Sequence, residues 1–194
     1  FGTTVSMQRP CIKWRQGFGE ERPSRMCSPL TDGCDENRDT EEKNMDRTQA
    51  VTLTNMCMVY NGRQVLVLEK ADDDWRGITF PGGHVEKDES FADSVIREVL
   101  EETGLTIVSP QLCGIKDWIR EDGSRYMVLL YRTNRFEGEL RSSSEGRAFW
   151  AAPEDLPHEN LSPDFMDVLK VFLDDTLSEF YYYLQDGQWH HTLQ

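Results

Sequence analysis

Hydrophobic and polar positions follow two different periods along the chain from Val51 onward. Alternation with a period of two, in segments rich in β-branched and aromatic residues, predicts strands, and apolar spacings of three and four predict helices. The expected strands span Val51–Tyr60, Gln64–Glu69, Ile78–Phe80, Leu112–Ile119, Tyr126–Thr133, Arg147–Trp150, Glu179–Leu184 and Gln188–Thr192. The expected helices span Phe91–Thr103 and Phe165–Asp174.

Turn and cap residues separate these elements. Asn61-Gly62 and Asp186-Gly187 are typical of two-residue hairpin turns. Ser90 is a favoured residue at the start of a helix, and Gly104 is typical of a helix end. The order of strands, helix, strands and helix predicts an α+β fold with a sheet flanked by helices.

Residues 1–44 differ from the rest of the chain. They are rich in charged residues, serine, proline and glycine, without apolar periodicity. Such a segment buries too little surface to offset its ordering entropy. We therefore expect a disordered N-terminal extension over 1–44 and a folded domain over 45–194. Met45 directly precedes that domain, so residues 1–44 are either a natural extension or sequence upstream of the natural start.

The composition and net charge of the chain restrict the classes of molecule that it is expected to bind. The 194 residues carry a formal net charge of −14, which opposes binding to nucleic-acid polymers and anionic membranes. Any phosphate ligand therefore requires a cation. No apolar run approaches the roughly 18 residues of a membrane span, and no signal-peptide pattern opens the chain. The five cysteines are odd in number and form no CxxC, which favours reduced thiols and a cytoplasmic location. The oligomeric state is not specified by the pattern.

The first expected helix carries a cluster of acids. Glu98, Glu101 and Glu102 are spaced to share one helix face, where like charges destabilise a helix by about 0.2–0.5 kcal/mol per pair. The opposite stripe is apolar and consists of Ala92, Val95, Ile96 and Val99. The stripe is expected to anchor the helix on the sheet and to leave the carboxylates facing outward.

Charge runs of this kind are usually solvated surfaces. Three features favour a metal site instead: the acids share one side, Pro81-Gly82-Gly83 lies just upstream, and Arg97 is placed to pair with Glu101. Clustered oxygen ligands without a partner cation of their own are what Mg²⁺ or Mn²⁺ binds.

The spacing of these residues resembles the signature box of the Nudix hydrolase family. All fixed positions are present, namely Gly83, Glu89, Arg97-Glu98, Val99, Glu101-Glu102 and Gly104-Leu105. The resemblance implies an α/β/α sandwich whose loop–helix–loop box binds two or three divalent cations, with Mg²⁺ as cofactor and Mn²⁺ as a substitute. The metal ligands that it implies are Glu98, Glu101, Glu102 and the carbonyl of Gly82.

The resemblance also implies roles for the remaining box residues. Gly83, Glu89 and Gly104 belong to the structural brace, with Glu89 paired to Arg97; a helix-capping role for Glu89 stays open. The reaction is attack of water on a phosphorus atom assisted by metal ions. Glu98 is the leading general base, and Arg97 is counted with it among the catalytic residues. Glu145, outside the box, is the alternative, and it is equally well interpreted as an ordinary loop acid.

Segments around the box resemble the 8-oxo-dGTP diphosphatase branch of the family, over about Val51 to the C-terminus. They include residues 75–86, 112–116, 136–150 and 177–181. The implied reaction converts 8-oxo-dGTP to 8-oxo-dGMP and pyrophosphate, which sanitises the nucleotide pool and prevents DNA damage. Candidate base-stacking residues are Trp118, Phe80 and Tyr126, each equally compatible with the core. Candidate phosphate contacts are Arg76, Lys116 and Arg132, each also compatible with a solvated surface. His84 is either a feature of this branch or a surface histidine.

Two other functions remain open at this stage. One is a Nudix diphosphatase for ordinary nucleoside triphosphates, nucleotide sugars or RNA 5′ ends. The other is a non-catalytic Nudix domain that senses ligands, although such domains usually lack box acids that this chain retains.

Overall fold

A mixed sheet forms the centre of the structure, a computed structural model that describes residues 48–70 and 77–194. Its strands are β1 (Val51–Asn61), β2 (Gln64–Lys70), β3 (Gly77–Thr79), β5 (Gln111–Ile119), β6 (Arg125–Thr133), β8 (Gly146–Ala151), β9 (Glu179–Gln185) and β10 (Gln188–Leu193). They are ordered β10-β9-β5-β6-β1-β2-β3, with β8 paired to β2. The pairs β1–β6 and β5–β9 are parallel and the others are antiparallel.

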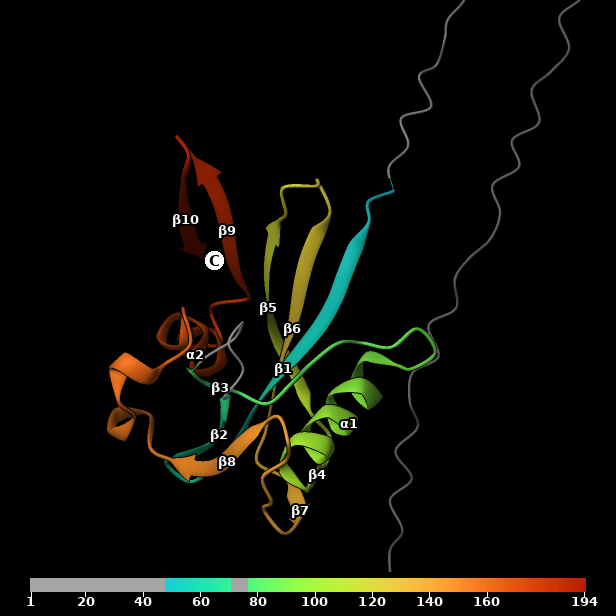
Figure 1. Cartoon of the computed structure of the whole chain (residues 1–194), viewed down its shortest axis with the longest axis vertical. Coiled ribbons are helices and arrows are strands. Elements are labelled where there is room, and N and C mark those ends of the chain that lie inside the picture. The colour runs from blue at the N-terminus through green and yellow to red at the C-terminus, as the bar shows by residue number, and fades with distance from the viewer. Residues whose placement is uncertain (1–47, 71–76) are drawn as a thin grey trace, which may run out of the picture. The chain divides into compact units, whose positions relative to one another are not determined.

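The two helices cover opposite faces of this sheet (Figure 1). Helix α1 (Phe91–Thr103) buries Val95 and Val99 against residues such as Cys57 and Val59 of β1. Helix α2 (Phe165–Leu173) buries its apolar stripe on the other side, in a cluster with Met58 and Phe80. Alternate residues of β1 therefore serve different cores, as the period of a strand requires. The expected α+β sandwich is confirmed.

The strands and helices expected from periodicity are all present. Four short elements were not expected: β4 (Leu105–Ile107), β7 (Phe136–Gly138), and the 3₁₀ turns η1 (Pro153–Asp155) and η2 (His158–Asn160). Strands β4 and β7 pair with each other below the end of α1. Elements this short show little of a hydrophobic period, and these four were missed although the equally short β3 was expected.

One of the two predicted hairpin turns is confirmed, and the other is displaced by one residue. The predicted turn at Asp186-Gly187 is confirmed, since both residues have positive φ (52° and 75°) and Gln185 pairs with Gln188. The turn predicted at Asn61-Gly62 is wrong by one residue. Asn61 still belongs to β1 and pairs with Gln64, so Gly62 and Arg63 form the turn. Gly62 takes the left-handed conformation there.

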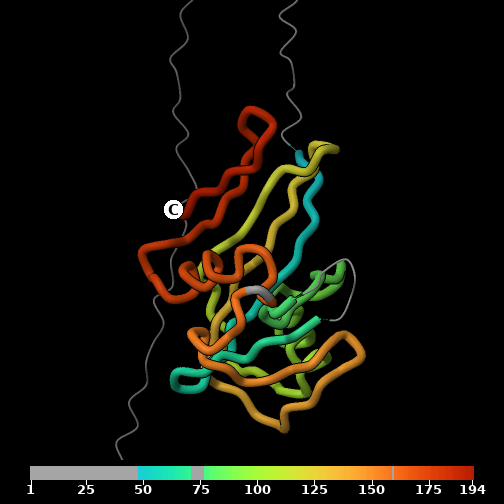
Figure 2. The backbone as a smooth tube through the Cα atoms, turned by 60° about the vertical axis from the view of Figure 1, so that its left-hand side comes forward, coloured from blue at the N-terminus to red at the C-terminus, as the bar shows by residue number. Residues whose placement is uncertain are grey.

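The β9–β10 hairpin extends the sheet at one edge (Figure 2). It pairs with β5 over three residues only, Ile115 to Asp117. Residues 1–44 lie outside the described residues, so the boundary near residue 45 and the expected disorder upstream of it stay predictions.

Candidate active site

The loop between β3 and α1 runs beside β1 and positions two glycines. The amide of Asn55 donates to the carbonyl of Gly83, and that of Cys57 to Pro81, both at 2.8 Å. A Cβ on Gly82 would lie 2.2 Å from the carbonyl oxygen of Asn55. A Cβ on Gly83 would lie 2.5 Å from the carboxyl group of Glu98. Glycine therefore lets the loop backbone pass directly beside Asn55 of β1 at position 82 and beside the Glu98 carboxyl group at position 83.

Helix α1 carries the box acids, and its ends are capped by the predicted residues. The Ser90 hydroxyl accepts a 3.1 Å hydrogen bond from the amide of Asp93, and Gly104 closes the helix with φ 74°. The box acids differ in exposure: the side chains of Glu98, Glu101 and Glu102 are 13%, 56% and 1% exposed. The expectation that all three face outward is wrong for Glu102. It continues the buried stripe of Val95 and Val99, because i, i+4 and i+7 lie on one side of a helix.

Arg97 links the loop to the acids of α1. Its guanidinium donates to both carboxylate oxygens of Glu89, at 2.7 and 3.0 Å, and to the carbonyl of His84 at 3.0 Å. Its remaining nitrogen donates to Glu98 at 2.9 Å and to Glu101 at 3.0 Å. These hydrogen bonds hold the pKa of Glu89 down, to about 2. The geometry favours the brace interpretation of Glu89 over the capping one, since Ser90 caps the helix.

Glu102 is a buried acid with a cation beside it. Its Oε2 accepts a 2.7 Å hydrogen bond from the amide of Gly82, and its Oε1 lies 3.1 Å from the ammonium of Lys70. Burial nevertheless raises the pKa of Glu102 to about 7, against the lowering effect of Lys70 and the Gly82 amide. Burial also raises the pKa of Glu98 above its ordinary value, again against the lowering effect of Arg97.

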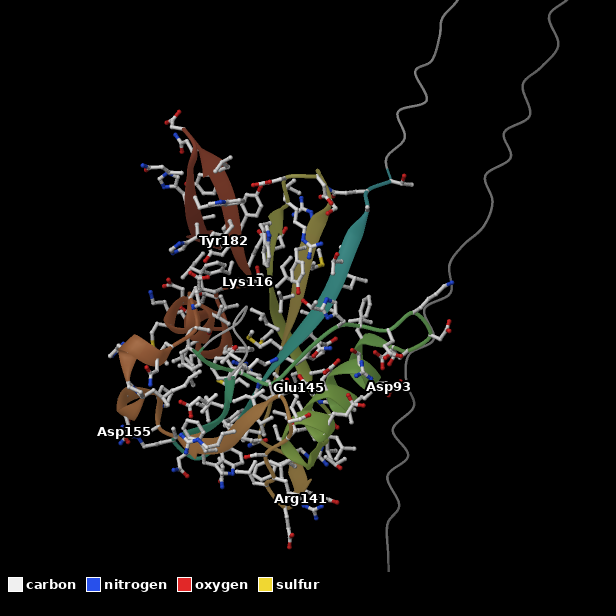
Figure 3. The ribbon with its side chains drawn as sticks, in the orientation of Figure 1. Asp93, Lys116, Arg141, Glu145, Asp155 and Tyr182 are labelled. Atoms are coloured by element: carbon white, nitrogen blue, oxygen red, sulfur yellow. The ribbon has the colours of Figure 1, made fainter. Side chains whose placement is uncertain are left out.

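Glu145 approaches this site from the loop before β8. Its side chain is 60% exposed and lies 3.9 Å from the Lys70 ammonium. Its charge adds to the rise in the pKa of both Glu98 and Glu102. In Figure 3 it lies between β8 and α1. The structure therefore brings Glu145 to the edge of the acid cluster, as its candidate role requires.

Cations of the chain itself lie among these carboxylates. The expected pairing of Arg97 with Glu101 is confirmed, whereas Lys70 is a partner cation that was not expected, so the acids are not without cations of their own. Within the described residues, no three acidic, histidine or cysteine side chains converge on one point as metal ligands do. The residues still fit a divalent cation. Their donors are hard oxygens, and Glu102 Oε1 is buried without a well-directed hydrogen bond from any described residue.

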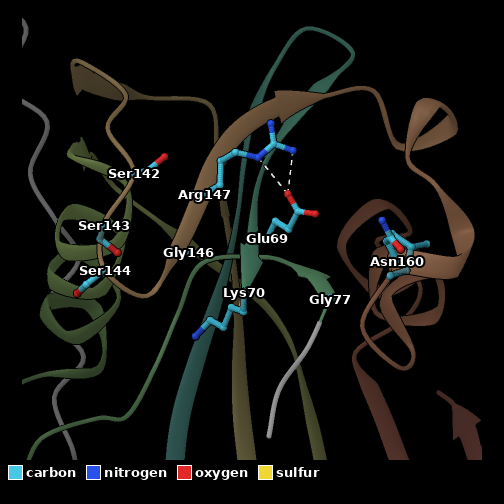
Figure 4. Close-up of a pocket in the computed structure, with 10 residues that line it drawn as sticks. Glu69, Lys70, Gly77, Ser142, Ser143, Ser144, Gly146, Arg147 and Asn160 are labelled. Atoms are coloured by element: carbon cyan, nitrogen blue, oxygen red, sulfur yellow. Dashed lines mark hydrogen bonds and ion pairs between the residues drawn. The ribbon is translucent and has the colours of Figure 1, made fainter. Parts of the chain in front are cut away.

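A pocket of about 820 Å³ opens next to Lys70 (Figure 4). Its walls come from the ends of β2, β3 and β8 and from η2. The polar lining includes Lys70, Arg147, Ser142, Ser143 and Ser144. Arg147 is paired with Glu69 at 2.8 Å. The pocket is therefore a polar space that adjoins the acid cluster through the side chain of Lys70.

A family model described as "NUDIX domain" matches residues 52–172, more than half of the 194-residue chain. The chain belongs to the Nudix family. It is accordingly a Nudix pyrophosphohydrolase, and it acts on nucleotide-like substrates. Nudix hydrolases generally use divalent ions such as Mg²⁺. No helix in the described part of this Nudix chain has the length and apolar character needed to cross a membrane.

Several Nudix hydrolases are similar in sequence. An uncharacterized Nudix hydrolase, YvcI of Bacillus subtilis, is 35% identical over 55% of this chain and 70% of its own length. The oxidized purine nucleoside triphosphate hydrolase of Danio rerio is 30% identical over 58% of this chain and 72% of its own. The CTP pyrophosphohydrolase of Escherichia coli is 28% identical over 58% of this chain and 84% of its own.

A solved structure shows the same fold. The mutator MutT protein of Bacillus halodurans superposes with a TM-score of 0.59 and 30% identity, over 73% of this chain and 97% of that one. The Nudix fold expected from the box is therefore confirmed.

Two of the predicted base-stacking residues line an aromatic surface near the Nudix box. Trp118 of β5 stacks on Tyr126 of β6, with ring centroids 4.5 Å apart. Tyr126 in turn lies edge-on to His84 of the box loop at 6.4 Å. Phe80, by contrast, is 2% exposed and packs between Phe165 and Phe172. Phe80 is therefore a core residue of the Nudix domain and is not available to stack on a nucleobase.

The predicted basic contacts do not lie at the Nudix box. Lys116 pairs with Asp164 at 3.3 Å, and its ammonium lies 5.5 Å from the centre of the Tyr182 ring (Figure 3). Arg132 donates to the carbonyl of Phe172 and pairs with Asp175. Arg132 is thus tied to α2 and to the segment after it, whereas the Lys116 ammonium also lies 5.8 Å from the centre of the Trp118 ring, beside the aromatic surface. Arg76 lies outside the described residues.

Lys70 is the active-site residue that the sequence did not indicate. It ends β2, 32 positions before Glu102 in the numbering of the chain, and nothing about its neighbours marks it. The packing of α1 beside Leu66 of β2 brings Lys70 to Glu102, and the pairing of Lys70 with Gly146 brings it to Glu145.

Proposed function

We propose that the chain hydrolyses 8-oxo-dGTP to 8-oxo-dGMP and pyrophosphate with Mg²⁺, in the cytoplasm. The observation that carries hydrolysis is the set of box acids held beside the glycine loop by Arg97. The oxidised purine is supported by the similarity to a relative named for that activity. A role in sanitising the nucleotide pool, and hence in DNA repair, follows from this substrate.

Four groups would hold the divalent ions: the carbonyl of Gly82 and the carboxylates of Glu98, Glu101 and Glu102. Bound there, the ions would ionise the attacking water more readily and neutralise phosphate charge. The chain's own residues supply position. Arg97 fixes the carboxylates of Glu98 and Glu101 relative to the loop, and the Gly82 amide holds Glu102.

We assign general-base catalysis to Glu98. It is largely buried, it lies against Gly83, and its carboxylate is held by Arg97. Burial raises the pKa of Glu98 above its ordinary value, which makes its carboxylate a stronger proton acceptor. In this scheme Glu98 accepts the proton of the water that attacks phosphorus, and the bridging oxygen leaves with pyrophosphate. Glu145, exposed and able to move, is the alternative base.

The nucleobase is expected on the aromatic surface of Trp118 and Tyr126, because a flat apolar wall binds a base by stacking. The second candidate function is hydrolysis of an ordinary nucleoside triphosphate. The similarity to a relative named CTP pyrophosphohydrolase favours it. A non-catalytic sensing role is disfavoured by the complete set of box acids.

The test is a comparison of kcat/KM for 8-oxo-dGTP, dGTP, CTP, a nucleotide sugar and a capped RNA 5′ end, with pyrophosphate or phosphate release as readout. We expect 8-oxo-dGTP to be preferred over dGTP by at least about tenfold, a difference of ~1.4 kcal/mol in transition-state binding. Equal turnover of these two nucleotides would remove the sanitising role. EDTA, Glu98→Gln and Glu102→Gln should each abolish most activity in a folded protein. Full activity in both variants would contradict the site.

A further inference from the structure

Lys70 pairs with different acids of the active site from those that Arg97 binds. Within the described part of the chain, its ion pairs are with two acids of the active site, Glu102 at 3.1 Å and Glu145 at 3.9 Å. Its own side chain is 22% exposed, whereas that of Glu102 is 1% exposed. A buried carboxylate without a compensating cation is strongly unfavourable. In the metal-free protein the ammonium of Lys70 is therefore the cation that neutralises Glu102.

The contacts of Lys70 are easily exchanged, unlike those of Arg97. The Arg97 guanidinium is held on two sides, by Glu89 and the His84 carbonyl and by Glu98 and Glu101. It cannot leave without breaking most of these hydrogen bonds. Lys70 has a compact charge on a flexible stem. Its contact with Glu102 is to a single oxygen, Oε1, at 3.1 Å, so one close ion pair, and not a set of directed hydrogen bonds, holds the ammonium there.

A second polar environment lies within reach of the same side chain. Lys70 lines the pocket of about 820 Å³ together with Arg147 and the three serines 142–144. The serine hydroxyls are donors suited to phosphate oxygens, whereas the Arg147 guanidinium already donates twice to Glu69, which also lines the pocket. Lys70 already forms part of the wall of this pocket, and its flexible four-carbon stem allows the ammonium to change direction.

We propose that Lys70 is a built-in cation that substitutes for a divalent ion at Glu102 and moves to a substrate phosphate when the ion binds. The inference rests on the proposed function, since it takes Glu102 as a metal ligand. It makes Lys70 a positioning residue that couples the two ligands. Ion binding releases the ammonium for phosphate, and phosphate withdraws it from Glu102. By thermodynamic linkage, each ligand then favours the other by the same factor.

The test measures Mn²⁺ binding to the full, nucleotide-free chain at pH 8, from the electron paramagnetic resonance signal of free Mn²⁺. We expect Lys70→Met to bind Mn²⁺ about fivefold to tenfold more tightly than the wild type, because the competing ammonium is gone. Lys70→Arg retains a charge and should bind no more tightly than the wild type. The matched control is Lys170→Met, which removes the same charge from an exposed pair with Asp167 and should leave the affinity unchanged.

Two further measurements separate this role from a purely structural one. Mn²⁺ should raise the melting temperature of Lys70→Met more than that of the wild type, because Glu102 has no other cation in the variant. A non-hydrolysable dGTP analogue should tighten Mn²⁺ binding to the wild type more than to Lys70→Met. If Lys70→Met does not fold, Lys70→Arg decides, since tighter Mn²⁺ binding by that variant overturns the inference.

The outcomes distinguish the two proposals. A wild-type chain that binds no Mn²⁺ overturns the metal site of the proposed function and this inference with it. A wild type that binds Mn²⁺ and hydrolyses nucleotide, while Lys70→Met binds Mn²⁺ equally or more weakly, overturns only the role of Lys70.

Discussion

The side-chain amide of Asn55 on β1 donates a 2.7 Å hydrogen bond to the hydroxyl of Ser94 on α1, and both side chains are buried. The backbone N–H of Asn55 donates to the carbonyl of Gly83, and the Ser94 hydroxyl donates to the carbonyl of His84 at 3.4 Å. One buried polar link therefore joins the sheet, the helix that carries the acids, and the glycine loop.

Ser94→Ala should lower the free energy of unfolding by about 1–3 kcal/mol, because the buried amide of Asn55 loses its partner. Urea denaturation of the metal-free protein measures this. The control is Ser144→Ala on the exposed loop before β8, which we expect to stay within about 0.5 kcal/mol of the wild type. Equal stability of the Ser94 variant and the control would show that the link contributes nothing.

Alanine at the two loop glycines should separate stability from activity. At Gly82 the new Cβ would meet the backbone of Asn55 at 2.2 Å, so Gly82→Ala should destabilise the fold. At Gly83 it would meet only the carboxyl end of the Glu98 side chain, at 2.5 Å, and that end can move aside. Gly83→Ala should therefore melt near the wild type and lose about 100-fold in kcat, a typical loss for a displaced catalytic group. A fully active Gly83→Ala would contradict the placement of Glu98.

The raised pKa of Glu102 gives a pH dependence of defined sign. The folded pKa of about 7 lies above the unfolded value near 4.5, so the folded state holds the proton more tightly. The contribution of Glu102 to stability is thus complete below about pH 4.5 and is lost as the pH rises through about 7. In EDTA, Glu102→Gln should remove this decline between the two values, as measured by urea denaturation at several pH values. A decline that persists unchanged in the variant would assign it to another group.

Activity should follow the same group in the opposite direction. Because protons compete with a divalent ion for Glu102, hydrolysis at limiting Mg²⁺ should rise as the pH increases through 7. Raising Mg²⁺ should shift this rise to lower pH. An optimum near pH 5 that ignores the Mg²⁺ concentration would argue against the metal-ligand role.

Trp118 and Phe80 should respond differently to truncation. Trp118→Ala should raise KM for the preferred nucleotide about tenfold, within the roughly 1–3 kcal/mol that stacking contributes per base, while Trp118→Phe should restore most of the affinity. Phe80→Ala should instead lower stability by about 3–5 kcal/mol, because Phe80 fills the core between Phe165 and Phe172. An unchanged KM in Trp118→Ala would move the base site elsewhere.

Much of the molecule is determined by local sequence. The strands, both helices, the caps at Ser90 and Gly104, and the turn at Asp186-Gly187 depend on period, side-chain chemistry and backbone freedom within a few residues. The Nudix box is also contiguous, so the pairing of Arg97 with Glu101, four residues on, follows from helix geometry. These features were predictable because the interactions that form them are short in sequence.

Only the tertiary structure decided which charges meet. Lys70 reaches Glu102 because α1 packs on the face of the sheet to which β2 contributes Leu66, and that contact has no signature in either segment. The tertiary structure also decided the different roles of two aromatic residues that looked alike in the sequence. Phe80 is buried against α2, whereas Trp118 of β5 is only partly buried. Helical period places Glu102 next to Glu98 and also in line with Val95 and Val99, so how deeply α1 sits on the sheet decided that its carboxylate is buried. The burial and the neighbours of a side chain depend on packing between segments that are distant in sequence. The pKa and the ion-pair partner of each acid follow from that packing.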